Sequence, residues 1–250
     1  MPGKTIARVI IVGLAGIALG GLIVLAGGPR WFVSTPPPLP PQPLIDAARG
    51  DPPAGVVAFE ERVQTGSSPI LVGSGFVLEL PSGDVVGLTT AHSLGAGNFT
   101  PVIFTLAGRE QPVLTFSELY APLGQPRTGA DLTVDYVIMR PDTAPDPAII
   151  LRPDPRGAPQ PGERVALYSG LGDGSGNPRI FQGTLESLDG NGAWIRMDEV
   201  FEPGMLSGSP VISQHTGQVV GMTIGMNWAP GTLRIGVNPI GSILNRAASR

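Results

Sequence analysis

The chain has two histidines, and only one of them stands where an enzyme needs a neutral-pH base. His92 follows the strand-like run 85–91 and precedes Ser93-Leu94-Gly95, so a rigid element can hold its ring at the edge of a cleft. His215 lies within residues 213–218, Ser-Gln-His-Thr-Gly-Gln, which is typical of a solvated hairpin turn. Because imidazole titrates close to neutral pH, His92 is the candidate general base.

A serine in a turn of small residues is the candidate nucleophile. Ser207 lies within residues 203–211, Pro-Gly-Met-Leu-Ser-Gly-Ser-Pro-Val. Small residues let the backbone turn sharply and bring amide groups close to a reacting carbonyl oxygen, as acyl transfer requires. A Ser-Gly-Ser-Pro sequence before a strand also occurs as a plain turn, so the interpretation depends on the partners of Ser207.

A serine and histidine pair needs a carboxylate that orients the imidazole and stabilises its cation. Two candidates, Asp131 and Asp135, lie in the segment 130–141. Asp135 directly precedes the apolar run 136–139 and so stands at the mouth of a buried strand. Choosing Asp131 would place Asp135 inside that strand as an unpaired charge, at a cost of several kcal/mol, so Asp135 is favoured.

Short apolar clusters bounded by Gly, Pro, Asn and Asp predict an all-β body that positions these residues. Six predicted strands form a first half and six a second, which suggests two six-stranded antiparallel β-barrels, at about 54–140 and 160–238. The predicted strands cover 56–63, 71–80, 85–91, 102–106, 113–116 and 134–139, then 165–168, 179–188, 193–197, 210–213, 219–224 and 233–237.

Two segments lie outside the predicted strands of the body. Residues 141–162 are rich in Pro and Asp and fit a connection between the barrels. Residues 239–248 predict a C-terminal helix, because Pro239 stands at the start and Ile240, Ile243 and Leu244 share a face. The predicted globular domain therefore spans residues 54–250.

Composition excludes several classes of function. The 250 residues carry 16 basic and 20 acidic side chains, so a net charge of −4 gives no basic field for nucleic acid. No cysteine is present, which removes disulfides, thiolate metal sites and cysteine nucleophiles.

The first 53 residues differ from the rest. Residues 9–28 contain no charge and are long enough for one membrane crossing, so residues 1–30 predict an N-terminal transmembrane helix, with a cleaved signal peptide as the alternative. Lys4 and Arg8 precede this segment and favour a single-pass anchor in the cell membrane with the body outside the cytoplasm. The proline-rich stretch within 31–53 predicts a semi-rigid linker, or alternatively a ligand for a proline-binding groove.

In residues 54–245 the chain resembles the trypsin/chymotrypsin-like serine proteases, particularly the cysteine-free bacterial HtrA/Deg branch. The resemblance rests on five segments that follow one another in the order His, Asp, Ser. They are Gly73-Ser74-Gly75-Phe76-Val77-Leu78, Thr89-Thr90-Ala91-His92, Asp135-Tyr136-Val137-Ile138-Met139, Ser207-Gly208-Ser209-Pro210-Val211 and Gln218-Val219-Val220-Gly221-Met222.

The resemblance implies a serine endopeptidase that acts on proteins or peptides without a metal or organic cofactor. It gives Ser207 as nucleophile, His92 as base and Asp135 as orienting group, with an acyl-enzyme intermediate. The amides of Met205 and Ser207 would form the oxyanion hole. The family usually has glycine where Met205 stands, and Leu206 is interpreted as an inserted residue.

The resemblance also implies where substrate binds. The uncharged residues Thr223, Ile224, Gly225 and Met226 would line the primary specificity pocket, with Asn227 after them. Phe201 and Glu202 lie near its base, and we expect a small or medium apolar side chain before the scissile bond. No peptide-binding module is expected after the terminal helix.

Two other interpretations remain open. The extra Leu206 motivates a catalytically inactive protease-like domain that acts as a binding module in the cell envelope. A β-rich structural module with incidental Ser, His and Asp is the third interpretation.

Overall fold

The computed structural model describes residues 58–65, 68–95, 99–172 and 176–249. All of them belong to one compact unit. The predicted transmembrane segment at 1–30 and the linker at 31–53 lie outside these residues. Within the described part of the chain, no helix has the length and apolar character needed to cross a membrane.

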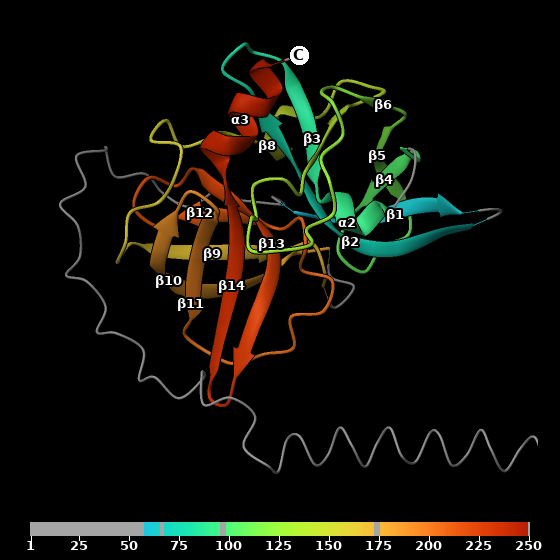
Figure 1. The fold of residues 1–250 in the computed structure, drawn as a ribbon. Helices are drawn as coiled ribbons and strands as arrows, with labels where there is room; N and C mark the ends of the chain where they lie inside the picture. Colours follow the sequence, from blue (N-terminus) through green and yellow to red (C-terminus); the bar gives the residue numbers. More distant parts are fainter. Residues whose placement is uncertain (1–57, 66–67, 96–98, 173–175, 250) are drawn as a thin grey trace, which may run out of the picture. The chain divides into compact units, whose positions relative to one another are not determined.

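The first half of the body is a curled, mainly antiparallel sheet (Figure 1). Its strands run in the order β5-β4-β1-β2-β3-β7-β6, and β8 pairs in parallel with β2. The strands are β1 (Phe59–Thr65), β2 (Ser68–Glu79), β3 (Val85–Thr89), β4 (Val102–Thr105), β5 (Pro112–Phe116), β6 (Glu118–Leu119), β7 (Val137–Arg140) and β8 (Ile150–Leu151).

The predicted all-β fold with two barrel-like halves is confirmed, and the first half differs from the prediction in strand count and closure. Six strands lie close to the predicted ranges, but β6 and β8 are additional, and β8 comes from the segment predicted to be only a connection. The sheet is an open half-barrel whose edge strands, β5 and β6, are separated by Ser117 alone. Asp142 stabilises the bend between β5 and β6. Its amide donates to Thr115 O, and its carboxylate accepts from the Ser117 amide and hydroxyl.

Aromatic side chains fill the half-barrel. The Phe104 ring lies 5.6 Å from that of Phe59 and 4.7 Å from that of Phe116, and all three side chains are fully buried. Gly75 makes room for this packing, since a Cβ at that position would lie 2.2 Å from Phe104 Cζ. Gly75, the second glycine of the Gly-Ser-Gly segment, is therefore required by the packing of the core.

The second half is a closed six-stranded barrel in the order β10-β11-β14-β13-β12-β9, as predicted. Alternating residues fill its interior, among them Leu167, Leu185, Ile195 and Val211. The strands are β9 (Arg164–Ser169), β10 (Arg179–Asp189), β11 (Gly192–Met197), β12 (Pro210–Ser213), β13 (Val219–Ala229) and β14 (Thr232–Pro239).

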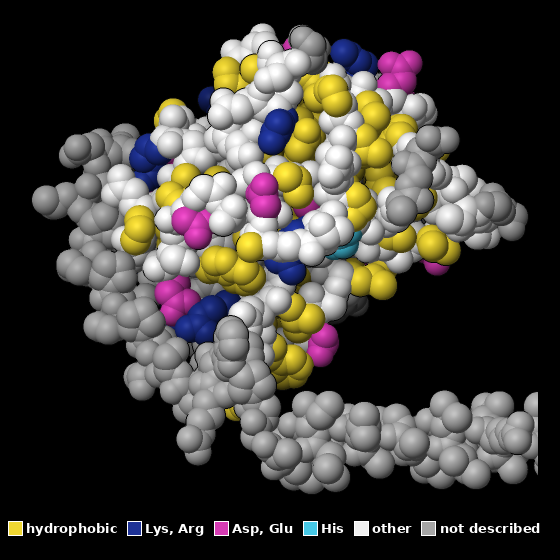
Figure 2. Space-filling view, viewed as in Figure 1, with side chains coloured by type: hydrophobic (Ala, Val, Ile, Leu, Met, Phe, Trp, Pro, Cys, Tyr) yellow, Lys and Arg dark blue, Asp and Glu magenta, His cyan; other side chains and the backbone are white. Residues whose placement is uncertain are grey.

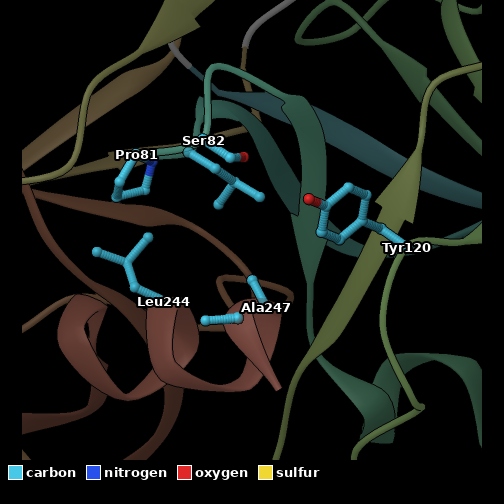
Figure 3. A pocket seen from close by; sticks show the side chains of 7 residues that line it. Pro81, Ser82, Tyr120, Leu244 and Ala247 are labelled. Atoms are coloured by element: carbon cyan, nitrogen blue, oxygen red, sulfur yellow. The ribbon is translucent and has the colours of Figure 1, made fainter. Parts of the chain in front are cut away.

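The predicted C-terminal helix is confirmed as α3 (Ile240–Ala248). Its buried residues Ile240, Ile243 and Ala247 join a core cluster to which both sheets contribute, including Leu78 and Ile212. On the neighbouring surface, Leu244 and Ala247 face Pro81 and Tyr120 across a cavity of about 280 Å³ (Figure 3). Two shorter helices are α2 (Ala91–Leu94) and the 3₁₀ turn η1 (Pro147–Ile149).

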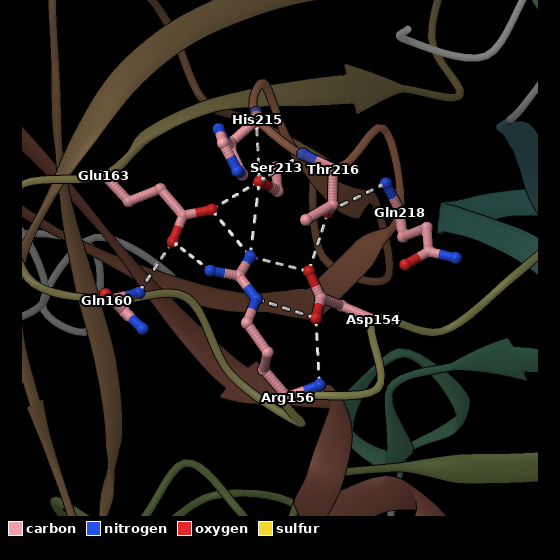
Figure 4. Close-up of polar contacts among 8 residues, drawn as sticks. All are labelled: Asp154, Arg156, Gln160, Glu163, Ser213, His215, Thr216 and Gln218. Atoms are coloured by element: carbon pink, nitrogen blue, oxygen red, sulfur yellow. Dashed lines mark hydrogen bonds and ion pairs between the residues drawn. The ribbon is translucent and has the colours of Figure 1, made fainter. Parts of the chain in front are cut away.

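A buried ionic network fixes the segment between the two sheets to the second barrel (Figure 4). The Arg156 guanidinium lies 2.6 Å from Asp154 Oδ2 and 2.9 Å from Glu163 Oε1, and both carboxylates are almost fully buried. Thr216 Oγ1 donates to Asp154, and Ser213 donates to Glu163. Each charge has partners, so the network stabilises the fold only as a complete set.

Replacing Arg156 by alanine should destabilise the protein by about 3–5 kcal/mol, because two buried carboxylates lose their counter-charge. Denaturant unfolding measures this. Arg152→Ala is the control, since the exposed Arg152–Glu79 pair should contribute at most about 1 kcal/mol. An equal loss in both variants would contradict the structural role assigned to the network.

Candidate active site

His92 is held by a single helical turn at the end of β3. Ala91 is buried and anchors α2, and the ring of His92 is left about one-third exposed. The other histidine is placed in the turn after β12, where the His215 amide donates to Ser213 Oγ. His92 thus lies at the end of a strand and His215 in a turn, although His215 is half-buried and not fully solvated as predicted.

Asp135 lies beneath the imidazole and is completely buried. Its Oδ2 is 2.7 Å from His92 Nδ1, and its Oδ1 accepts from the His92 amide at 3.1 Å. The amide of Arg127 also donates to Oδ2, at 3.1 Å. These donors leave the carboxylate one orientation and favour a proton on Nδ1 of His92, so that Nε2 is free to accept.

Asp131 serves a different purpose. Its Oδ1 accepts from the amide and hydroxyl of Thr133, and these hydrogen bonds lower the pKa of the Asp131 carboxyl. The structure therefore brings Asp135, and not Asp131, to the histidine. The predicted strand 134–139 begins only at Val137, which leaves Asp135 in the loop that precedes it.

Ser207 completes the cluster, with its Oγ 2.8 Å from His92 Nε2 and 3.4 Å from Ile224 O. The following residue, Gly208, has a φ of 89°, and a Cβ there would lie 1.9 Å from Ser74 O. Only glycine fits this position, because both the backbone conformation and the space exclude a side chain.

Met205 has a left-handed backbone conformation, which glycine adopts more readily than other residues. Its φ is 59°, and the Leu206 amide donates to Pro203 O across the turn that contains it. Ser74 Oγ donates to Met205 O at 3.1 Å and fixes the peptide. Among the described residues, the amides of Met205 and Ser207 have no hydrogen-bond acceptor.

Leu206 is a core residue of the second barrel. Its side chain is only 5% exposed and packs with the interior cluster of that barrel. Its carbonyl accepts from Thr223 Oγ1 and from the Ser209 amide. The loop around Leu206, which was interpreted as an inserted residue, is packed and hydrogen-bonded, and its unusual backbone angle lies at Met205.

A cavity of about 250 Å³ opens beside Ser207 and His92. All four residues predicted from sequence to bind substrate, Thr223 to Met226, line it. Figure 2 shows hydrophobic side chains near the histidine that is visible on this face, together with basic and acidic side chains. The other lining residues are Pro203, Gly204, Met205, Leu206 and Ile235.

Phe201 and Glu202 do not line this cavity. The ring of Phe201 stacks on Phe181, with 3.7 Å between centroids. Ile235, which the sequence reasoning missed, reaches the cavity because β13 and β14 pair Met226 with Ile235. Knowledge of the register between these two strands would have been needed to identify Ile235 from the sequence.

Glu61 is a buried acid beneath the site that the sequence reasoning also missed. It is fully buried on β1, and Oε1 has no hydrogen-bond partner. Burial raises the pKa of this carboxyl from its ordinary 4.5 to about 8, although hydrogen bonds from Thr89 and Ser93 oppose the rise. The strand prediction marked the segment but did not identify which charged residue faces inward.

The hydrogen bonds around Thr89 agree with a protonated Glu61. Thr89 Oγ1 lies 2.7 Å from Glu61 Oε2 and 2.9 Å from Ser74 O. A hydroxyl has one proton, and a carbonyl can only accept. Both contacts are therefore full hydrogen bonds only when Glu61 donates its own proton to Thr89.

Residues 73–222, more than half of the chain, match the trypsin-like peptidase domain family. The chain belongs to this family of serine-type hydrolases. No curated protein sequence matches it. The narrower assignment to the HtrA/Deg branch stays a prediction.

Solved structures agree in fold at low sequence identity. A thermostable serine protease, AL20, from an extremophilic microorganism is 14% identical with a TM-score of 0.54, covering 77% of this chain and 96% of its own. The protease Anisep from Arthrobacter nicotinovorans is 15% identical with a TM-score of 0.54, and the match covers 81% of this chain and 99% of that protease. Human heparin binding protein is 13% identical with a TM-score of 0.55, and the match covers 83% of this chain and 96% of that protein.

Glu61→Gln should flatten the pH dependence of stability. The unfolded carboxyl loses its proton near pH 4.5 and the folded one near pH 8, so wild-type stability should fall across that window and level off above it. The glutamine variant lacks this slope and should gain several kcal/mol over wild type by pH 8.

Denaturant unfolding between pH 5 and pH 8.5 checks the expected change. Glu118→Gln, at an exposed position, is the control and should keep the wild-type slope. A Glu61→Gln variant with an unchanged slope would show that Glu61 is ionised in the folded protein.

Proposed function

We propose that the protein is a serine endopeptidase that cuts peptide bonds with Ser207, His92 and Asp135. The observation that carries the proposal is the unbroken chain of contacts from Asp135 Oδ2 to His92 Nδ1 and from His92 Nε2 to Ser207 Oγ. Nucleophile, base and orienting carboxylate are within hydrogen-bond reach of one another before any substrate binds.

In the proposed reaction, His92 Nε2 takes the Ser207 proton while Oγ attacks the substrate carbonyl carbon. The resulting imidazolium is stabilised by the buried carboxylate of Asp135. His92 then gives the proton to the leaving amine as the peptide bond breaks, and the acyl group remains on Oγ. A water molecule attacks the acyl-enzyme by the same route and releases the acid.

We assign the oxyanion hole to the amides of Met205 and Ser207. The left-handed backbone at Met205 supports this assignment, because a residue in that conformation can turn its amide as glycine does. The hydrogen bond from Ser74 to Met205 O holds the peptide in place before charge develops, as preorganised stabilisation requires.

The alternative of an inactive binding domain depended on Leu206. Since Leu206 is packed in the barrel core and its carbonyl is hydrogen-bonded, the residue gives no reason to expect a collapsed nucleophile loop. The peptidase interpretation is therefore preferred over the binding module.

A fluorophosphonate probe tests the enzyme directly. The full chain should be labelled, and Ser207→Ala and His92→Ala should abolish labelling while the fold persists by circular dichroism. Asp135→Asn should lower kcat by about 10⁴-fold, because the tautomer of His92 is lost. His215→Ala is the control and should react normally. Folded wild-type protein that resists the probe would refute the proposal.

We further propose that the primary pocket takes a small or medium apolar side chain. Its lining contains no Asp, Glu, Lys or Arg, and the apolar side chains of Met226 and Ile235 are part of it. Peptides that differ only at the residue before the scissile bond should give the highest kcat/KM with Ala or Val. Cleavage confined to peptides with Arg or Lys there would overturn this assignment.

We also propose that residues 9–28 anchor the protein in the cell membrane, with the peptidase domain outside the cytoplasm. The length of this uncharged segment and the basic residues before it support the proposal. Fractionation of cells that produce the full chain checks this proposal. The protein labelled by the fluorophosphonate probe should stay in the membrane fraction after alkaline washing.

A further inference from the structure

Arg127 is fixed beside the candidate active site by its own backbone. Its amide donates to Asp135 Oδ2, and the amides of Gln125 and Gly124 donate to Val134 O and Tyr136 O. These bonds tie the segment before Asp135 to the segment around it. Arg127 therefore has a set position relative to His92, whatever its side chain does.

The guanidinium of Arg127 lies over the backbone of Gly225. A Cβ placed on Gly225 would be 3.5 Å from Arg127 Cζ and 3.5–3.6 Å from its two terminal nitrogens. Gly225 lies between Ile224, whose carbonyl is 3.4 Å from Ser207 Oγ, and Met226, which lines the primary pocket. The positive charge thus stands directly next to the residues proposed to hold substrate.

This charge has no counter-ion within the part of the chain that the structure describes. Arg156, Arg164 and Arg234 each form ion pairs with carboxylates, whereas no described acceptor bonds to the Arg127 guanidinium. The side chain is only partly exposed. A cation held at a cleft without a partner is a ready site for an anionic group of a ligand.

The edge of β13 determines which part of a substrate meets Arg127. Its partner β12 pairs only with residues 219–222, so from Gly225 onward the edge opposite β14 has no strand partner among the described residues. An extended peptide can pair with such an edge, and its side chains then alternate between two faces. One face meets the primary pocket, and the other meets Arg127.

We propose that Arg127 forms a subsite for an acidic side chain of the substrate, at the second or fourth residue before the scissile bond. The residue in the primary pocket and the third residue share one face, so the even-numbered positions point toward Arg127. The subsite rests on the proposed peptidase function and extends it to a substrate class, peptides with Glu or Asp ahead of an apolar residue.

Matched peptides test this subsite. They share one apolar residue at the scissile bond and carry Glu, Gln or Lys at the second or the fourth position before it. Wild-type kcat/KM should favour Glu over Gln by about five- to tenfold at low salt for at least one of these positions. Arg127→Gln should remove the preference, and Arg127→Glu should transfer it to Lys. Arg152→Gln, at a solvent-exposed arginine, is the control and should behave as wild type.

A binding assay separates failure of the subsite from failure of catalysis. Fluorescence anisotropy with full-length Ser207→Ala and the same peptides should show the Glu preference, and the double variant Ser207→Ala, Arg127→Gln should lose it. Equal binding of Glu and Gln peptides at both positions would refute the subsite, even if the wild type cuts both. A Glu preference in binding without cleavage would keep the subsite and refute the peptidase.

Discussion

The candidate site depends on the hydrogen bonds of Ser74, because they join the half-barrel to the loop of the second barrel that contains Ser207. Its amide donates to Ser207 O at 2.8 Å, its hydroxyl donates to Met205 O, and the Gly170 amide donates to that hydroxyl at 3.2 Å. Its carbonyl lies 2.9 Å from Thr89 Oγ1. One buried serine thus fixes the backbone on both sides of Leu206 and connects it to β3, the strand that leads to the turn of His92.

Much of the fold followed from the sequence, because each strand is a short apolar run between turn residues and needs only local pattern to be seen. The strands of the second barrel and α3 were predicted to within two residues, except that β13 continues to Ala229, five residues beyond the predicted end. The first sheet was less predictable, since β6 and β8 have two residues each and are defined by hydrogen bonds to distant strands. No local sequence pattern predicts the pairing of Val77 with Ile150.

The candidate site shows the same division. His92 could be proposed because histidines are scarce, Asp135 because burying it unpaired would be costly, and the set with Ser207 because its order resembles that of the trypsin-like proteases. Glu61 and Arg127 could not, since their roles arise from what faces them in space. The pKa of Glu61 is raised because β1 buries its side chain beneath the turn of His92. The guanidinium of Arg127 lies over Gly225 because of the conformation of the loop before Asp135.

The burial of Leu206 ties the proposed nucleophile to the core of the second barrel. Its neighbour Ser207 is held in place by the packing of the leucine side chain in the interior of the second barrel and by the hydrogen bond from Thr223 to the Leu206 carbonyl. Under the proposed function, the alignment of the nucleophile depends on the folded barrel core, so an unfolded chain is not expected to cut peptides.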